Sequence, residues 1–340
     1  MAREAGVSLA TVDRVLNARP GVREKTIRAV NDAIARIGYV RDVAAANLAR
    51  QRVYRFVFAL PDAGSQFLLA LRAAIDEAAQ GMISERSEVR IVTYPLRDPH
   101  VLVEAFAGRN LDGAAIMAPE TPEVRDLILR LKEKGVAVAT LVSDQPHAAR
   151  DHFVGIDNLA AGRTAGVLMG RFLGGRPGKV AVVVSSILAR DMVDRRLGFD
   201  AVLAERFPEL EPLASIEGHD DAEQTARVLR ACLAENGPVA GVYVAAAGTR
   251  GVTATLEAMG LAGRVTVIAH DLTPHTRLAL ESGAIDAVIA QDVGHLARSA
   301  LRVLRARVDG RDILPAQERI RIEIMLRENL PPVADSGPSP

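Results

Sequence analysis

The chain has 340 residues, of which 49% are hydrophobic and 25% charged, so it can form large packed cores and is not a disordered protein. Its 42 basic and 42 acidic side chains cancel overall, but residues 1–52 carry a net charge of +5 and the remainder carries −5. This asymmetry indicates a polyanionic partner for the N-terminal part alone. Because Cys232 is the single cysteine, neither an intramolecular disulfide nor a thiolate metal cage is expected.

Targeting signals are also missing from the pattern. No apolar run approaches the roughly 18 residues that cross a bilayer. The N-terminal residues lack the apolar segment of a secretory signal. The sequence therefore predicts a soluble, cytoplasmic protein with no membrane partner.

Residues 1–40 have a helical pattern interrupted by glycine. Gly6 is suited to end a first helix, because it tolerates positive φ, and Ser8 is suited to cap a second. A third helix is expected over Glu24–Ile37, ending at Gly38. The inward side chains predicted for the second and third helices are Val12, Val15, Leu16, Ile27, Val30, Ile34 and Ile37. Three helices with a tight glycine turn have the geometry of a helix-turn-helix DNA reader, although a helical hairpin that caps the next domain fits this pattern too.

A short Ala-rich helix is expected over residues 41–52, and residues 331–340 have the composition of a disordered tail. Between them, apolar runs of strand length alternate with helical patterns such as Phe67–Ala79 and Glu123–Lys134. Predicted strands are Arg55–Leu60, Val89–Tyr94, Gly113–Ala118, Val136–Val142, Phe153–Ile156, Lys179–Val184, Val239–Ala245, Val265–Ala269, Ala284–Ala290 and an edge strand, Arg319–Met325.

The strands are mostly continuous Val, Ile and Ala runs, which are typical of parallel sheets buried on both faces. Helices between successive strands supply the crossover connections of an α/β fold. About 280 residues of this alternation exceed one sheet, so we expect two doubly wound lobes. Because ligands bind outside the carboxyl ends of the strands in such lobes, a cleft between them is the expected site.

The N-terminal residues carry a resemblance to a known family. Residues 2–17 read Ala-Arg-Glu-Ala-Gly-Val-Ser-x-x-Thr-Val-x-Arg-Val-Leu-Asn, and Val22, Thr26, Gly38-Tyr39 and an Ala-rich segment ending in Leu48 follow. This pattern resembles the headpiece of the lactose-repressor (LacI/GalR) family, and the body resembles that family's periplasmic-binding-protein-like effector domain. The resemblance implies a headpiece at residues 1–40 and a hinge helix at 41–52. It further implies a first lobe from 53–152 with 292–314, and a second lobe from 153–291 with 315–330.

The resemblance assigns DNA contacts to individual residues of the headpiece. Leu9, Ala10 and Arg14 fall on base-reading positions, and a guanidinium such as that of Arg14 can bond guanine O6 and N7 together. The positions that hold phosphates are Ser8, Thr11, Asn17 and Thr26. Asp13 departs from the family's small hydroxyl residue, and an acid there should weaken DNA binding unless Arg14 or Arg3 neutralises it.

The hinge helix is expected to contact the minor groove through Ala45 and Leu48. By the resemblance, Leu48 is the apolar wedge that kinks the duplex. A helix this short is marginal alone, so its exposed leucine needs a partner. Packing of Leu48 on the first lobe is the alternative.

Enzyme signatures are absent from the body. There is no Gly-x-Ser-x-Gly nucleophile motif, no phosphate-binding loop with the required spacing and no His-x-x-x-His pair. We therefore expect no catalytic residue, no metal and no cofactor.

Polar residues recur instead where strands end. Carboxylates, amides, a guanidinium and an aromatic plate around a cleft suit the hydroxyls of a sugar or polyol, and the candidates are Asp62, Gln66, Phe67, Asp144, Arg195, Asp271 and Gln291. The resemblance assigns sugar contacts to Arg195, Asp271 and Gln291. Each aspartate has an alternative role as a cap of a helix or loop, and Asp157-Asn158 are expected to shape a loop. Ala245–Ala247 lack the Asn-Asp pair often found there in the family, which favours an atypical or smaller effector.

These features together predict a transcriptional regulator, most simply a repressor, that binds a pseudo-palindromic DNA operator as a homodimer. A sugar or polyol effector between the lobes would change their closure angle and so the operator affinity. Two alternatives are a cytoplasmic solute-binding protein and a sugar-processing enzyme, either of them with a non-functional headpiece.

Overall fold

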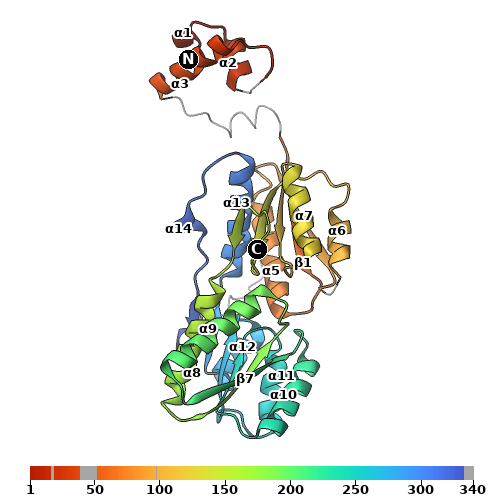
Figure 1. The fold of residues 1–340 in the computed structure, drawn as a ribbon, viewed down its shortest axis with the longest axis vertical. Helices are drawn as coiled ribbons and strands as arrows, with labels where there is room; N and C mark the ends of the chain where they lie inside the picture. Colours follow the sequence, from red (N-terminus) through yellow and green to blue (C-terminus); the bar gives the residue numbers. More distant parts are fainter. Residues whose placement is uncertain (17–18, 39–51, 97, 333–340) are drawn as a thin grey trace, which may run out of the picture. The chain divides into compact units, whose positions relative to one another are not determined.

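The computed structural model of this protein describes residues 1–16, 19–38, 52–96 and 98–332. It divides into two units, residues 1–52 and 53–340 (Figure 1). The predicted hinge helix, apart from Arg52, and nearly all of the predicted tail lie outside the described residues. Among the described helices, none is long and apolar enough to cross a membrane.

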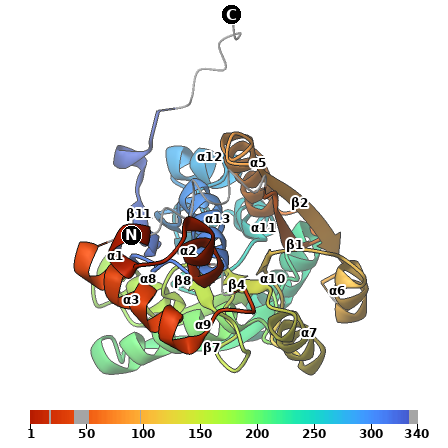
Figure 2. The same ribbon diagram turned by 90° about the horizontal axis from the view of Figure 1, so that it is seen from above.

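The described residues of the N-terminal unit form three helices, α1 (Ala2–Ala5), α2 (Leu9–Leu16) and α3 (Glu24–Ile37) (Figure 2). Gly6 ends α1 in the left-handed conformation with φ of 64°. The Ser8 hydroxyl accepts a hydrogen bond of 3.1 Å from the Thr11 amide at the start of α2. An ion pair of 3.2 Å between Glu4 and Arg36 joins α1 to α3. The tight glycine turn and the serine cap are therefore confirmed.

The core of this unit is narrower than the sequence pattern predicts. Val12, Val30 and Ala33 are buried, whereas Ile27 and Ile37 are 37% and 45% exposed. The prediction that Ile27 and Ile37 point inward was wrong. The two short helices α1 and α2 cover only a thin stripe of α3, so side chains at the edges of that stripe keep contact with solvent.

The body, residues 53–340, contains two sheets. The first sheet has the order β2-β1-β3-β4-β5 and the second β11-β10-β9-β8-β6-β7. Every described pair of neighbouring strands is parallel except β10 and β11, so the predicted doubly wound lobes are confirmed. The strands are β1 (Tyr54–Pro61), β2 (Ser87–Tyr94), β3 (Gly113–Ile116), β4 (Ala137–Leu141), β5 (His152–Val154), β6 (Gly178–Val184), β7 (Leu210–Glu217), β8 (Gly241–Val244), β9 (Thr266–His270), β10 (Ala287–Ala290) and β11 (Glu323–Met325).

Helices cover both faces of the first sheet (Figure 1). Side chains alternate along β1: Phe56 and Phe58 face the core that contains α5 and α13, while Val57 and Ala59 face the core that contains α6 and α7. A strand buried on both faces needs apolar residues at every position, which explains the continuous run. The helices are α5 (Gln66–Gly81), α6 (Pro99–Phe106), α7 (Pro122–Glu133) and α13 (Val293–Val308).

The second sheet is covered in the same way. Val180 and Val182 of β6 pack with α8 and α9, and Ala181 and Val183 pack with α10 to α12. The helices are α8 (Asn158–Leu173), α9 (Arg190–Arg206), α10 (Ala222–Asn236), α11 (Thr249–Ala258) and α12 (Pro274–Ser282). A short helix, α14 (Pro315–Glu318), precedes β11, and a 3₁₀ turn, η1 (Arg327–Asn329), follows it.

Two details differ from the sequence pattern. Strand β7 was not predicted, because its segment contains Pro212 and, as expected at a sheet edge, buries only Leu210 and Leu213. Strand β5 pairs with β4 in the first sheet, so the chain enters the second lobe after Val154, slightly later than expected.

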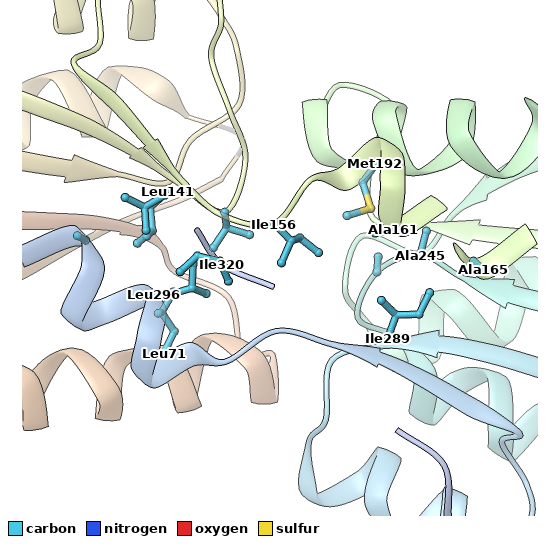
Figure 3. Close-up of a cluster of buried hydrophobic side chains, with 14 of the residues drawn as sticks. Leu71, Leu141, Ile156, Ala161, Ala165, Met192, Ala245, Ile289, Leu296 and Ile320 are labelled. Atoms are coloured by element: carbon cyan, nitrogen blue, oxygen red, sulfur yellow. The ribbon is translucent and has the colours of Figure 1, made fainter. Parts of the chain in front are cut away.

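A buried apolar seam joins the two lobes. The chain passes between them at residues 155–157, 291–292 and 309–322. Figure 3 shows Ile156 and Ile320, which lie in these connections, between Leu296 of the first lobe and Ile289 of the second. Because these side chains belong to one buried cluster, the lobes share a core where the connections run.

Helices α8 and α9 approach each other backbone to backbone. A methyl group on Gly162 would lie 1.9 Å from the carbonyl oxygen of Arg195, and one on Gly198 would lie 2.2 Å from that of Leu159. Neither glycine has positive φ, so the requirement is space. This contact sets the position of α9 relative to α8.

Substitution Gly162→Ala is therefore expected to destabilise the body. Overpacking of this kind costs about 1–3 kcal/mol, and each kcal/mol corresponds to a fall of about 2–4 °C in Tm. Differential scanning calorimetry of the full chain measures it. The matched control is Gly81→Ala in α5, where an added methyl group meets nothing within 4 Å. Equal Tm values for the two variants would contradict the close-packing argument.

Candidate functional site

A cavity lies between the lobes at the carboxyl ends of their strands. The two sheets share the order 2-1-3-4-5 when their first five strands are numbered separately, which places a crevice where the order reverses. Loops after β1, β3 and β4 of the first lobe and β6 to β10 of the second line a cavity of about 90 Å³. A neighbouring pocket of about 290 Å³ shares Phe67, Asp220 and Asp271 with it. Ligand pockets of about 300–1,000 Å³ hold drug-sized molecules, so the cavity suits a small ligand.

Arg195 of α9 is the cation of the cavity wall. Its side chain is 2% exposed. Nε donates to Oδ1 of Asn158 at 2.9 Å, and Nη1 donates to the carbonyl oxygen of Ala245 at 2.6 Å. These bonds fix the plane of the guanidinium, whose remaining edge is available to the cavity.

Three carboxylates line the same cavity: Asp191, Asp220 and Asp271. Oδ1 of Asp271 accepts from Nε2 of Gln291 at 3.0 Å, while Oδ1 of Asp220 and Oε1 of Gln291 are buried without a hydrogen-bond partner in the described chain. Burial raises the pKa of Asp220 to about 6, and repulsion by Asp191 contributes. Burial also raises the pKa of Asp271, against the opposing effects of Arg195 and Gln291.

The cavity contains strained backbone. Five non-glycine residues of the described chain have positive φ, and Val142 (65°), Asp220 (58°) and Asp271 (64°) line the cavity. This conformation is unusual for a β-branched residue such as Val142. Strain of this kind costs on the order of 1–3 kcal/mol per residue and is common at binding sites. It turns the chain sharply at the strand ends, where polar groups meet the cavity.

Behind the cavity, Tyr243 and His270 form a buried pair, with the Tyr243 hydroxyl 2.9 Å from Nε2 of His270. Phe199 stacks on Tyr243 with ring centroids 4.5 Å apart. Burial, assisted by the charge of Arg195, holds the pKa of His270 well below its usual value. The imidazole is therefore neutral and contributes no second cation.

Contacts across the cavity hold the lobes together. The Asp191 amide donates to the Ser143 hydroxyl at 3.4 Å, and the His275 amide donates to Oε1 of Gln66 at 3.2 Å. Nδ2 of Asn158 donates to the carbonyl oxygen of Val142 at 3.3 Å. The described arrangement of the lobes is therefore closed on the cavity.

The structure brings together five of the seven residues predicted at the cleft. Phe67, Arg195, Asp271 and Gln291 line the cavity, and Gln66 lines the adjoining pocket. The structure contradicts the prediction for the other two, Asp144 and Asp62.

The placement of Asp144 at the cleft was wrong. Its carboxylate binds Arg150 at 2.5 Å and Thr140 at 2.9 Å, away from the cavity. Burial acts to raise the pKa of Asp144, but the hydrogen bonds from Arg150 and Thr140 hold it below its usual value. The physical reason is the turn at Val142, whose positive φ directs Ser143 to the cavity instead.

Asp62 was also wrongly placed. Its side chain is 69% exposed, lies 3.6 Å from Arg72 and does not line the cavity. Strand β1 continues through Pro61, so the next residue points outward, and Ala63 and Ser65 line the cavity.

Sequence reasoning missed Asp191, Asp220 and Asn158. Asp191 precedes Arg195 by four residues, a spacing that places both on one helix face and could have indicated it. Asp220 follows β7, the strand that was not predicted. Asn158 was expected to shape a loop, but it is buried at the start of α8 and holds Arg195.

In the N-terminal unit, the three residues predicted to read bases are solvent-exposed on α2: Leu9 (79% exposed), Ala10 and Arg14. Ser8 is exposed, and Thr11 and Thr26 are half-buried. Asp13 lies 3.3 Å from Arg19, so the neutralising cation differs from the two expected. The predicted contact residues Asn17, Ala45 and Leu48 lie outside the described residues.

No group of three or more His, Cys, Asp or Glu side chains among the described residues is arranged to hold a metal ion.

Comparison with known families separates the same two units. Residues 56–312 match the family described as periplasmic binding protein domain, and residues 1–42 match the family described as bacterial regulatory proteins, lacI family.

The curated relatives include a transcriptional regulator and a catabolite control protein. The chain is 48% identical over 67 residues to the HTH-type transcriptional regulator RegA of Clostridium saccharobutylicum, which covers 20% of each chain. It is 29% identical over 148 residues to catabolite control protein A of Priestia megaterium, which covers 42% of each chain. The chain thus spans less than half the length of these relatives.

Solved structures of solute-binding proteins share the fold of the body. GanP, a glucose-galactose binding protein from Geobacillus stearothermophilus, is 20% identical with a TM-score of 0.74, covering 82% of this chain and 99% of its own. A solute-binding protein from Bacillus halodurans with bound myo-inositol is 19% identical with a TM-score of 0.73, covering 81% and 95%. Because the first of these family models covers most of the chain, the body of this protein belongs to the periplasmic binding protein domain family, and residues 1–42 in front of it match the lacI family of bacterial regulatory proteins.

Proposed function

We propose that this protein is a sequence-specific DNA-binding transcriptional regulator, a repressor, whose operator affinity is controlled by a small sugar or polyol-like effector in the cavity. It acts as a homodimer on a pseudo-palindromic operator, because two symmetric headpieces each read one half-site. The observation that carries the proposal is one chain that combines an exposed helix, α2, with a cavity in a separate unit whose wall contains buried charged and amide side chains.

The headpiece supports the DNA-binding part. Helix α2 exposes Leu9, Ala10 and Arg14, and residues 1–52 carry a net charge of +5. Arg14 supplies the guanidinium that recognises guanine, while Leu9 and Ala10 offer apolar contacts to thymine methyl groups. The positive charge attracts the phosphates of any duplex.

The cavity supports the effector part. Structural neighbours of the body carry glucose or galactose, D-arabinose or myo-inositol in their titles, and the polar groups of Arg195, Asp271 and Gln291 suit hydroxyls. A ligand that touches both lobes favours their closed arrangement, and such coupling is typically about 1–3 kcal/mol.

Substitution Arg14→Ala is expected to abolish sequence preference. Loss of a bidentate base contact lowers affinity for the selected operator by about 1–3 kcal/mol, and affinity for random duplex falls less. Selection from a randomised duplex library, followed by titration of the enriched and random duplexes at two salt concentrations, measures both.

The matched control is Arg28→Ala, which removes one exposed charge from α3 next to Glu24. This substitution should weaken binding to the enriched and the random duplex equally, because it removes only an attraction to phosphates. If Arg14→Ala and Arg28→Ala behaved alike, α2 would not be the base-reading helix.

Substitution Asp271→Asn is expected to remove the effector response while operator binding persists. Asn tolerates the positive φ of this position but carries no charge, so it tests the carboxylate without adding strain. The readout is the shift in operator affinity caused by a binding sugar or polyol. Asp62→Asn is the control, because this exposed acid lies beside the first strand but outside the cavity. A lost response in both variants, or in neither, would contradict the assignment of the cavity.

A further inference from the structure

The cavity carries more negative than positive charge. Asp191, Asp220 and Asp271 line it together with one guanidinium, that of Arg195. Nearby cations are already balanced or lie outside: Arg190 is 3.0 Å from Asp194, and the exposed Arg250 lines the adjoining pocket with Asp221. Two carboxylate charges therefore have no matching cation in the cavity wall.

The unsatisfied groups of the cavity are hydrogen-bond acceptors. Gln291 is 7% exposed and its Oε1 has no partner in the described chain. Asp220 is half-buried, and its Oδ1 also has no partner there. Asp191 is also 7% exposed, and it lines the same cavity. A buried acceptor without a partner costs free energy, so a complementary ligand must bring donors.

A neutral sugar supplies donors but no charge. Its hydroxyls satisfy the orphan acceptors, yet the mutual repulsion of the carboxylates stays in a buried site, where it is screened weakly. An ammonium group supplies three donors and one positive charge at a single atom. It therefore matches the cavity better than a hydroxyl does.

We propose that the effector carries a protonated amine, as an amino sugar or amino polyol does, and that Asp191 and Asp220 hold this ammonium. Asp271, Arg195 and Gln291, which already bond to protein groups, orient the hydroxyls of the same ligand. This inference rests on the proposed effector site, since it concerns what that cavity binds.

The excess charge can be tested without a ligand. The pKa of Asp220 in the folded chain is about 6, raised from 3.8 by burial and by Asp191 and Asp271, with Arg195 opposing. The stabilising contribution of its protonated form is present below pH 3.8 and is lost as pH rises through 6. Asp220→Asn removes this loss, so it should raise Tm by about 3 °C more at pH 8 than at pH 5. A variant that is no more stable than the native chain at pH 8 would contradict the excess charge.

The ligand class is tested with matched pairs on the full-length protein. Calorimetry at pH 7 compares D-glucosamine with D-glucose, D-galactosamine with D-galactose, and 1-amino-1-deoxysorbitol with sorbitol; N-acetylglucosamine controls for size without charge. In at least one pair the amine should bind about tenfold more tightly than its neutral partner. This preference should fall to about twofold or less in Asp191→Asn and Asp220→Asn. Asp271→Asn should instead weaken binding of the amine and of its neutral partner by the same factor.

Three outcomes overturn the inference. The neutral member of every pair binds as tightly as its amine, the preference survives in Asp191→Asn and Asp220→Asn, or no compound of the panel binds. Neutral sugar binding that Asp271→Asn removes would reject the amine and leave the proposed function intact. Sugar binding that Asp271→Asn leaves unchanged would count against the proposed effector site as well.

Discussion

A guanidinium that is 2% exposed needs hydrogen-bond partners inside the protein, and Arg195 finds two of them on neighbouring segments of the second lobe. Asn158 of α8 and the carbonyl oxygen of Ala245 accept its hydrogen bonds. The close approach at Gly162 keeps α8 and α9 near enough for the Asn158 bond to form. Without this cation, three carboxylates would face one another in a buried cavity, so the site depends on it.

The same region connects the lobes and gives the cavity mechanical importance. Asn158 also bonds to the carbonyl oxygen of Val142 in the first lobe, so the group that holds Arg195 spans the cleft. Helix α13 begins next to Gln291 in the cavity and extends about 24 Å at 1.5 Å per residue. At its far end, Arg305 lies over the ring of Tyr54, at 3.6 Å from its centroid. Tyr54 is the first residue of β1, the strand that follows the N-terminal unit in the chain. Helix α13 therefore runs from the cavity to the start of β1.

Most of the fold followed from residue pattern because central strands are buried on both faces and must be apolar throughout, as Phe56–Leu60 are. Strand β7 lies at a sheet edge and contains Pro212, so it lacks this continuous apolar run and was not predicted. Asp220, which follows β7, was missed for the same reason. Asp144 was misplaced because a positive φ at Val142 changes which residue faces the cavity. Valine rarely adopts positive φ, so the sequence gives no sign of this turn. Arg195 and Asp271 were predictable because the family resemblance carried over to them, whereas the excess acids that distinguish this cavity, Asp191 and Asp220, were not.

Positive φ at Val142, Asp220 and Asp271 and the repulsion among buried acids both lower the stability of the folded protein. Of these two costs, the charge repulsion is the one that a ligand can relieve. A ligand that binds the closed lobes more tightly than the open ones adds its binding free energy to the closed state alone. A small molecule with the right charge can shift the balance between the two arrangements because Asp191, from one lobe, bonds through its backbone to Ser143 of the other.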